Sequence, residues 1–388
     1  MIQVDISNIW GSASLPDLLA LEAEVSLAHR TLSTDSETGE NVLRRMYEGA
    51  AAAAGELGKI HSAAELIRED SEVLVVVEGS GCTGAGAVIE LLQGRDRNLH
   101  RGKGDPQILF VGRGITGRRW AELVKNLEGK EFSLCVIGCG EMAPEAELAF
   151  RELKWLLERR FGTDEARSRI YAVAGGEESR LEKQAMEEGW HCFPAPDNGF
   201  GEFSVLSAAG LLPMAAAGID VEQLLKGAAR GKEAFDLRSY ENPVWLYAAC
   251  RNLLHRKGGC AELLVCPEGD FAGMGAWWQK IFARGDRELF PVFSAGNLSS
   301  LAAENGGKLF VTLLRFEQAQ PAGSTEENLD TMAESAFREA LDCWAEMGTG
   351  VICVDCAQPN AAAVGELLCF FQLSGVISGS LMQTASAR

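Results

Sequence analysis

Short apolar runs separated by helical patterns constrain the fold of this 388-residue chain more than any other feature. Runs of this length without polar alternation are typical of strands buried on both faces, and helices are the connections that parallel strands need. The pattern therefore predicts an α/β protein with two parallel sheets in tandem, behind an N-terminal segment that is helical over residues 15–69. The runs are VLVVV (73–77), ILFV (108–111), SLCVI (133–137), RIYAVA (169–174), AELLVC (261–266), KLFVTLLRF (308–316) and GVICVDC (350–356).

The charge balance and the N-terminus indicate which partners and compartment to expect. Lys and Arg number 36 against 55 Asp and Glu, a net charge of −19, which disfavours nucleic acid and anionic membranes as partners. The first residues lack a basic start followed by an apolar core, and no run of about 18 apolar residues occurs, so we expect neither a secretory signal nor a membrane span. Eleven cysteines in such a chain predict reduced thiols in the cytoplasm.

A glycine pattern follows the first apolar run, in VVVEGSGCTGAGAVIELL. Gly79, Gly81 and Gly84 spell G-x-G-x-x-G between a strand and a helix, which is the context of a dinucleotide-binding loop. Arg113 follows the next apolar run, where it would meet the 2′-phosphate of NADP. The alternative is a tight strand-to-helix turn, which favours glycine without any ligand.

Residues 197–220, DNGFGEFSVLSAAGLLPMAAAGID, combine a polar, glycine-punctuated loop with a helix of small residues. Such a loop brings backbone N–H groups and a helix N-terminus to one place, which suits an anionic ligand.

This stretch resembles the signature of glucose-6-phosphate isomerases, and the resemblance continues over about residues 66–382. GAWWQKIFARGDRELFPVFSAGNLSSL and VICVDCAQPNAAAVGELLCFFQLSGVISGSLM resemble two later segments of the same family. The resemblance implies two sugar-isomerase (SIS) domains of flavodoxin-like three-layer α/β/α type, and a homodimer. The expected division is a helical segment over 1–65, a first SIS domain over 66–201 and a second, with leading helices, over 202–388.

The family's catalytic positions carry the wrong side chains for its reaction. Aldose–ketose isomerisation needs a carboxylate that moves a proton between adjacent carbons and a cation that stabilises the enediolate. Glu202 stands where the family has the arginine, Arg284 where it has the glutamate base, and Ser299 where it has a histidine. The family's late lysine has no counterpart before Arg388. The exchanged charges of Glu202 and Arg284 fit either a compensating salt bridge across the cleft or independent drift.

The phosphate loop of the family is altered as well. Its Ser/Thr-rich loop is replaced by Gly138, Cys139, Gly140 and Glu141, and a carboxylate at that place would oppose a phosphate dianion by about 1–4 kcal/mol. The expected catalytic positions are Glu202 and Arg284. The expected ligand-binding positions are Gly79, Ser80, Gly81, Thr83, Arg113, Thr116, Gly138, Cys139, Gly140, Glu141, Gly201 and Ser299.

Two other clusters allow a functional and a structural interpretation. Arg113, Arg118 and Arg119 are either an anion site or the solvated start of a helix. The thiol pairs Cys353/Cys356 and Cys135/Cys139 lie in or beside strands, so we expect buried thiols without a redox or metal role.

The sequence predicts a catalytically impaired glucose-6-phosphate isomerase relative that binds a sugar phosphate or a related anion, with no metal or organic cofactor. Three alternatives stay open: an isomerase for a changed phosphosugar with Glu78, Glu141 or Glu202 as its base, a genuine glucose-6-phosphate isomerase, and an NADP-binding protein.

Overall fold

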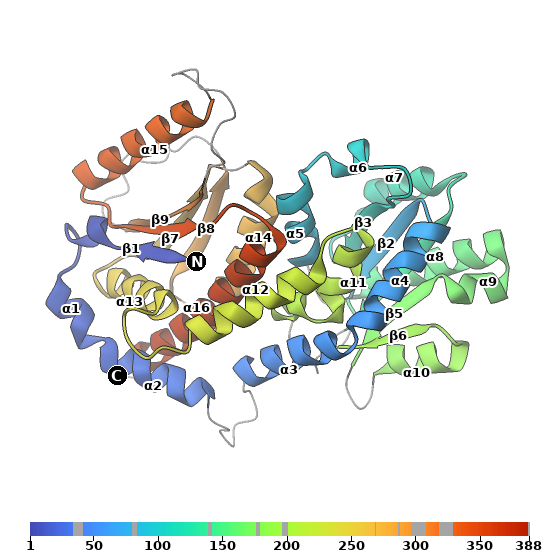
Figure 1. The fold of residues 1–388 in the computed structure, drawn as a ribbon, viewed down its shortest axis with the longest axis horizontal. Helices are drawn as coiled ribbons and strands as arrows, with labels where there is room; N and C mark the ends of the chain where they lie inside the picture. Colours follow the sequence, from blue (N-terminus) through green and yellow to red (C-terminus); the bar gives the residue numbers. More distant parts are fainter. Residues whose placement is uncertain are drawn as a thin grey trace. The chain divides into compact units, whose positions relative to one another are not determined.

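The chain folds into two compact units, each built around a five-stranded sheet (Figure 1). The computed structural model describes residues 1–33, 42–79, 84–138, 142–175, 179–195, 201–267, 269–285, 288–295, 308–317 and 329–386. Unit 1 comprises Met1–Leu43 and Lys226–Arg388, and unit 2 comprises Arg44–Leu225.

The sheet of unit 2 is parallel throughout, with the strand order β3-β2-β4-β5-β6. β2 and β4 at its centre are buried along their whole length, which explains why their sequences read as uninterrupted apolar runs. The strands are β2 (Val73–Glu78), β3 (Gln107–Gly112), β4 (Phe132–Gly138), β5 (Ile170–Ala174) and β6 (His191–Pro194).

Helices cover both faces of this sheet. On one face α7 (Gly117–Leu127), α8 (Pro144–Phe161) and α10 (Arg180–Glu188) bury apolar side chains against β2 and β4. The predicted apolar face of α8 is confirmed, because all five of its members are buried: Ala146, Ala149, Phe150, Leu153 and Leu157. The other helices of the unit are α4 (Leu57–Asp70), α5 (Gly84–Gln93), α6 (Arg97–His100), α9 (Thr163–Ser168) and α11 (Ala208–Ala216), with the 3-10 turn η2 (Gly201–Leu206); α3 (Val42–Gly55) and α12 (Val221–Ala234) cross the sequence division between the units.

α11 contains the small-residue part of the family-like signature, and all nine of its residues are buried. It packs against α4, α5 and η2. Its small side chains permit a very close approach, since a Cβ atom on Gly210 would lie 1.9 Å from the carbonyl oxygen of Val205. The signature therefore has a packing role in the interior of unit 2.

The sheet of unit 1 has the order β1-β10-β9-β7-β8, in which β1 alone is antiparallel to its neighbour. Its strands are β1 (Gln3–Asp5), β7 (Ala261–Cys266), β8 (Phe290–Ala295), β9 (Leu309–Phe316) and β10 (Val351–Cys356). α15 (Leu329–Glu346) contributes Phe337, Ala340 and Trp344 to the core that covers one face of this sheet. The remaining elements are η1 (Ser7–Ile9), α1 (Leu15–Ala20), α2 (Glu22–Ser33), α13 (Pro243–Arg256), η3 (Gly269–Phe271), α14 (Ala272–Gly285) and α16 (Ala361–Ser386).

One helix in the described part of the chain, Ala361–Gln383 within α16, is long and apolar enough to cross a membrane by length and composition. In its most apolar window 72% is buried, because α13 and α14 pack against it. A long, mainly apolar helix that is covered in this way is typical of a protein core. Small and polar residues interrupt its apolar run, which is why the sequence predicted no span there.

The two units differ from the predicted division at residues 65 and 201. The N-terminal segment contains the strand β1, which pairs Val4 with Val354 of β10 and so ties residues 1–43 to unit 1. α4 and α11 pack together, so the residues on either side of position 201 belong to unit 2.

Candidate functional site

The carboxyl ends of β2, β3 and β4 meet at one edge of the unit 2 sheet. The register places Glu78, the last residue of β2, beside Gly112, the last residue of β3, and beside Ile137, the last but one of β4. Ligands of parallel α/β sheets bind outside the carboxyl ends of the strands, so this edge is the candidate site.

Glycines at this edge allow the strand ends to pack closely. A Cβ on Gly79 would lie 2.6 Å from the carbonyl oxygen of Ile137, and one on Gly138 would lie 2.7 Å from Cδ2 of Leu181. The Gly79 N–H also donates to the Ile137 carbonyl at 2.8 Å. The first glycine of the G-x-G-x-x-G pattern is thus required by packing, without reference to a dinucleotide.

Two helices begin directly after the loops of this edge. α5 begins at Gly84, and α8 begins at Pro144, a residue well suited to a first helical turn. Their N-terminal N–H groups provide the partial positive charge that an anion needs. The predicted ligand residues of the two loops, Ser80, Gly81, Thr83, Cys139, Gly140 and Glu141, lie outside the described residues.

Glu78 places a carboxylate at the centre of the same edge. It is the last residue of β2 and is 8% exposed. Burial, and secondly the charge of Glu78, raise the pKa of the neighbouring Cys135 thiol. A desolvated acid in this position is able to act as a base, and it also opposes the binding of a second negative charge.

The loop from β3 to α7 carries the arginine cluster predicted from the sequence. Thr116 caps α7, because its Oγ1 accepts the Arg119 N–H at 3.4 Å, so this hydroxyl already has a structural role. Arg118 and Arg119 each contact Glu122, at 3.2 and 3.3 Å, in exposed pairs that contribute little to stability. Arg113 is exposed, and with Arg119 it lines a hollow of about 440 Å³ between β3 and α7.

Gly201 and Glu202 lie in η2, immediately before α11. Gly201 has φ +41° and its carbonyl accepts a hydrogen bond from Ser204 Oγ at 2.6 Å, while Glu202 is half-buried. Ser207 Oγ accepts the N–H of Ala209, so the buried start of α11 is capped by its own chain. At this predicted anion cradle, the N–H group of Ala209 is therefore already bonded within the chain.

The second predicted catalytic position, Arg284, lies in the last turn of α14 in unit 1 and is exposed. Ser299 lies outside the described residues. Because Glu202 belongs to unit 2 and Arg284 to unit 1, their salt bridge stays a prediction.

A buried polar network in unit 1 was not predicted. Glu262 on β7 and Arg251 on α13 are both completely buried, and Arg251 Nε lies 2.5 Å from Glu262 Oε2. The sequence did contain a signal for this pair, because AELLVC and LYAACRNLL each carry one charged residue within an apolar run. Charged residues are rarely buried unless they are paired.

Of the predicted thiol pairs, Cys135, Cys353 and Cys356 are buried, whereas Cys260 elsewhere in the chain is exposed. Burial raises the pKa of Cys250, Cys353 and Cys369 to about 12, so these groups are protonated at neutral pH. Cys139 lies outside the described residues. Within the described ranges, no group of three or more His, Cys, Asp or Glu side chains is placed to hold a metal ion.

The two sheets with their helices define a double SIS-domain α/β protein. A hypothetical protein from Thermus thermophilus superposes with a TM-score of 0.81 at 18% identity, covering 98% of this chain and 94% of that one. A glucose-6-phosphate isomerase from Chlamydia trachomatis superposes with a TM-score of 0.69 at 14% identity, covering 93% and 76%. These likenesses confirm the predicted fold.

Sequence comparison gives the family. The chain is 31% identical to the glucose-6-phosphate isomerase of Bacillus cereus (strain AH187) over 410 aligned positions, covering 98% of this chain and 91% of the relative. The isomerase of Shouchella clausii (strain KSM-K16) is also 31% identical, with 98% and 90% covered. The chain belongs to the glucose-6-phosphate isomerase family. No family model matches it.

Proposed function

We propose that this family member binds a sugar phosphate or a related anion and is impaired in interconverting glucose 6-phosphate and fructose 6-phosphate. The observation that carries the proposal is the exchange of charge at Glu202 and Arg284 in a chain that otherwise aligns with the isomerases over 98% of its length. A guanidinium carries only hydrogen-bond donors and cannot take the proton that the family's carboxylate moves. A carboxylate in the arginine's place destabilises the enediolate.

The carboxyl edge of the unit 2 sheet supports the binding part of the proposal. α5 and α8 both begin there, and the N–H groups of their first turns favour an anion. Glu78 acts against it, because two negative charges at close range repel each other even at a protein surface. We therefore infer weaker phosphate binding than in a member with an uncharged edge.

A second candidate function rests on the same carboxylate. Glu78 is buried at the strand ends, where the substrate of an isomerase has to lie, and an acid held there is placed to abstract a proton. Under this alternative the chain isomerises a different phosphosugar. The names of the sequence relatives favour a third, the ordinary isomerase reaction. The proposal also includes a homodimer, which the family resemblance implies, and a cytoplasmic location, which the cysteine content indicates.

Ligand binding is tested by calorimetric titration and by thermal unfolding of the full chain with fructose 6-phosphate, with fructose and inorganic phosphate as comparators. We expect fructose 6-phosphate to raise the unfolding temperature in a concentration-dependent way, and fructose to have no effect. Glu78→Gln is expected to tighten binding at least about fivefold, which corresponds to about 1 kcal/mol. Glu152→Gln on α8 removes the same charge from a side chain that is 45% exposed, and should leave binding unchanged.

Two results would overturn the binding proposal. The first is the absence of any stabilisation by fructose 6-phosphate in both the parent chain and Glu78→Gln. The second is equal stabilisation by fructose, which lacks the phosphate.

A further inference from the structure

The outer edge of β3 presents main-chain groups away from the sheet. Among the described strands β3 pairs with β2 alone. The Gln107 N–H donates to the Glu72 carbonyl at 2.8 Å, so Gln107 faces the β2 side. Because the direction alternates along a strand, the N–H and C=O groups of Ile108 and Phe110 and the N–H of Gly112 face outward.

At Ile108, the side chain of Asn98 already makes the hydrogen bonds that a neighbouring strand would make. Asn98 Nδ2 donates to the Ile108 carbonyl at 3.1 Å, and the Ile108 N–H donates to Asn98 Oδ1 at 3.1 Å. A carboxamide has the same donor and acceptor as a peptide group, so these are the two bonds that a residue of a neighbouring strand makes. Within the described part of the chain, no side chain makes the same pair of bonds with Phe110, two residues further along.

The edge beyond Asn98 borders a groove. The hollow of about 440 Å³ is lined by consecutive residues of the edge strand and its loop, Ile108–Ile115, and by one side of α7. Its lining includes the apolar residues Leu109 and Leu123 and the acid Glu122. The groove thus offers both main-chain hydrogen-bonding groups and apolar surface along the length of one strand.

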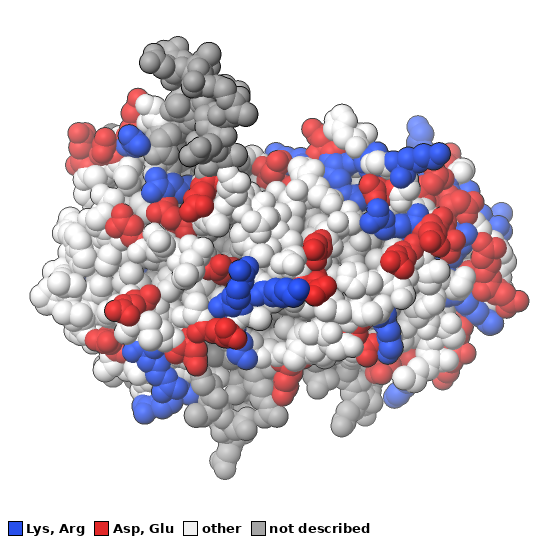
Figure 2. Space-filling view, viewed as in Figure 1, with Lys and Arg blue, Asp and Glu red and all other residues white. Residues whose placement is uncertain are grey.

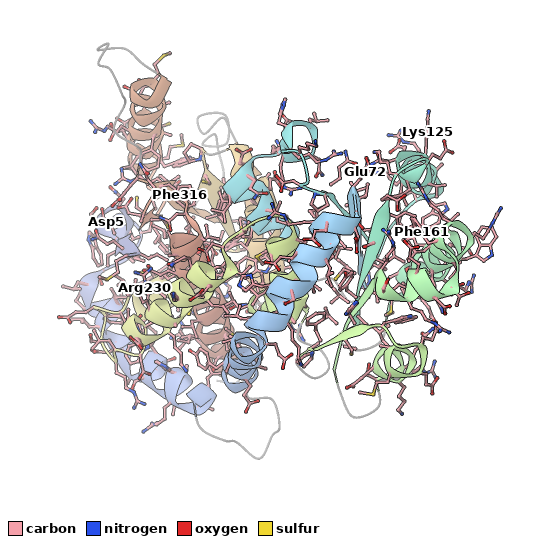
Figure 3. The ribbon with its side chains drawn as sticks, turned by 45° about the vertical axis from the view of Figure 1, so that its right-hand side comes forward. Asp5, Glu72, Lys125, Phe161, Arg230 and Phe316 are labelled. Atoms are coloured by element: carbon pink, nitrogen blue, oxygen red, sulfur yellow. The ribbon has the colours of Figure 1, made fainter. Side chains whose placement is uncertain are left out.

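Positive charge is concentrated around this edge. Residues 95–125 contain eight Lys and Arg against three Asp and Glu, a local charge of +5 in a chain whose net charge is −19. The basic residues flank β3 at both ends, with Arg101 and Lys103 before it and Arg113 and Arg119 after it. Figure 2 shows Lys and Arg side chains gathered at the upper right of that view, and Figure 3 shows Lys125 of α7 directed outward.

We propose that the open edge of β3 binds an extended acidic segment of a partner protein, which adds to the sheet as a sixth strand. The partner's main chain pairs with Phe110 and Gly112, and its carboxylates lie against Arg113 and Arg119. A peptide fits this edge better than a nucleic acid does, because the outward main-chain groups repeat about every 6.6 Å, the two-residue repeat of a β-strand. The binding site adjoins the carboxyl edge at Glu78, because Gly112 is the register partner of Glu78.

The test uses a fluorescein-labelled ten-residue peptide that alternates glutamate and threonine, with fluorescence anisotropy of the full chain as the readout. One comparator carries N-methyl groups on alternate residues, which remove peptide N–H donors and keep the charge. A second replaces each glutamate by lysine. We expect the N-methylated peptide to bind at least about tenfold more weakly, and the lysine peptide not to bind. Amide hydrogen exchange over residues 107–112 should slow on addition of the first peptide.

Matched variants separate the edge from general charge. Arg113→Ala/Arg119→Ala is expected to weaken peptide binding about tenfold or more. Arg151→Ala/Arg167→Ala removes the same charge from exposed arginines elsewhere in unit 2 and should not change the affinity. The proposal is overturned if the N-methylated peptide binds equally well, if both double variants lose affinity alike, or if an oligodeoxynucleotide of equal charge binds as tightly and slows the same amides.

Discussion

The core of unit 1 contains a fully buried ion pair between Glu262 and Arg251. Glu262 also accepts hydrogen bonds from Tyr247 Oη and Thr312 Oγ1, both at 2.7 Å. The Arg251 guanidinium lies 4.1 Å from the ring centre of Phe282 and donates to Ser378 Oγ. Both charges are thus satisfied by side chains from several elements, which makes the network sensitive to the loss of one partner.

Removing the charge of Glu262 should destabilise the protein strongly. Glu262→Gln keeps the shape of the side chain but leaves the buried arginine without its counter-charge. The free energy of unfolding should therefore fall by about 3–5 kcal/mol. Thr312→Val removes a single hydrogen bond, from an uncharged donor, to the same carboxylate and should cost about 1–3 kcal/mol. Urea unfolding measures both, and a loss below that of Thr312→Val would contradict this account of the network.

A buried histidine makes stability depend on pH. His29 Nδ1 accepts the Trp245 Nε1–H at 2.7 Å, which requires the neutral ring. Burial lowers the pKa of His29, with Asp236 raising it and Arg238 lowering it further. The folded state therefore takes up its proton at lower pH than the unfolded state does, whose pKa is about 6.5. The contribution of His29 to stability is fully present above about pH 6.5 and is lost as the pH falls below that value.

His29→Gln tests this prediction because glutamine offers an acceptor that does not titrate. The difference in unfolding free energy between the parent and this variant should shrink as the pH is lowered from 7 to 5. His61→Gln, at an exposed position on α4, is the matched control and should give a constant difference. A His29→Gln difference that is equally constant would remove His29 as the cause.

At the residue scale, the sequence predicted where some residues of the site lie, but it did not predict the structural role of each. Gly79 was predicted from the glycine pattern and Gly138 from the family resemblance, and both lie at the carboxyl edge. The role of Thr116, a predicted ligand that caps α7, depends on where its helix begins. The buried pair of Glu262 and Arg251 depends on residues that contact each other across the fold, which no local pattern reports.

At the scale of elements, α11 is the tightly packed helix of the family signature. A methyl group on Gly210 would overlap the Val205 carbonyl oxygen, which belongs to the adjoining turn η2 and cannot move independently. Gly210→Ala should therefore lower the free energy of unfolding by about 1–3 kcal/mol or more.

The matched control is Gly58→Ala on α4, where nothing lies within 4 Å of the added Cβ. That variant should be neutral or more stable by up to about 1 kcal/mol, because alanine is the better helix former. Thermal unfolding of both compares packing with helix propensity directly. Equal effects of the two substitutions on thermal unfolding would show that the close approach at Gly210 does not make α11 sensitive to an added methyl group.

The seven strands with long apolar runs were predicted within a residue or two. Six of them are largely buried, which leaves a clear pattern, and β3 is an edge strand whose apolar run ILFV was still sufficient. β1, β6 and β8 were missed. β1 has three residues and pairs with the far end of the chain, and β6 has four residues at the edge of a sheet. β8 is also an edge strand, and its Phe290 and Val292 are exposed. Edge strands are half-buried, so their sequences carry a weaker signal.

At the scale of the whole molecule, the fold and the family agree, and the reaction is the open question. Two parallel-sheet units and 31% identity over 98% of the chain make it a glucose-6-phosphate isomerase relative. The family motif in α11 consists of residues that pack in the interior. Such packing residues are retained in a fold even when its catalytic side chains differ. We propose that the charges at Glu202 and Arg284 set the chain apart from the reaction of its relatives.

The most direct measurement is proton abstraction from the substrate. Fructose 6-phosphate is incubated with the purified chain in D₂O, and NMR follows both deuterium incorporation next to the carbonyl and the appearance of glucose 6-phosphate. We expect neither to exceed the rate without protein, under conditions where the sugar phosphate raises the unfolding temperature. Turnover at ordinary enzyme rates, about 1 per second or faster, would contradict the account, since it would show that the exchanged charges do not prevent the family's reaction.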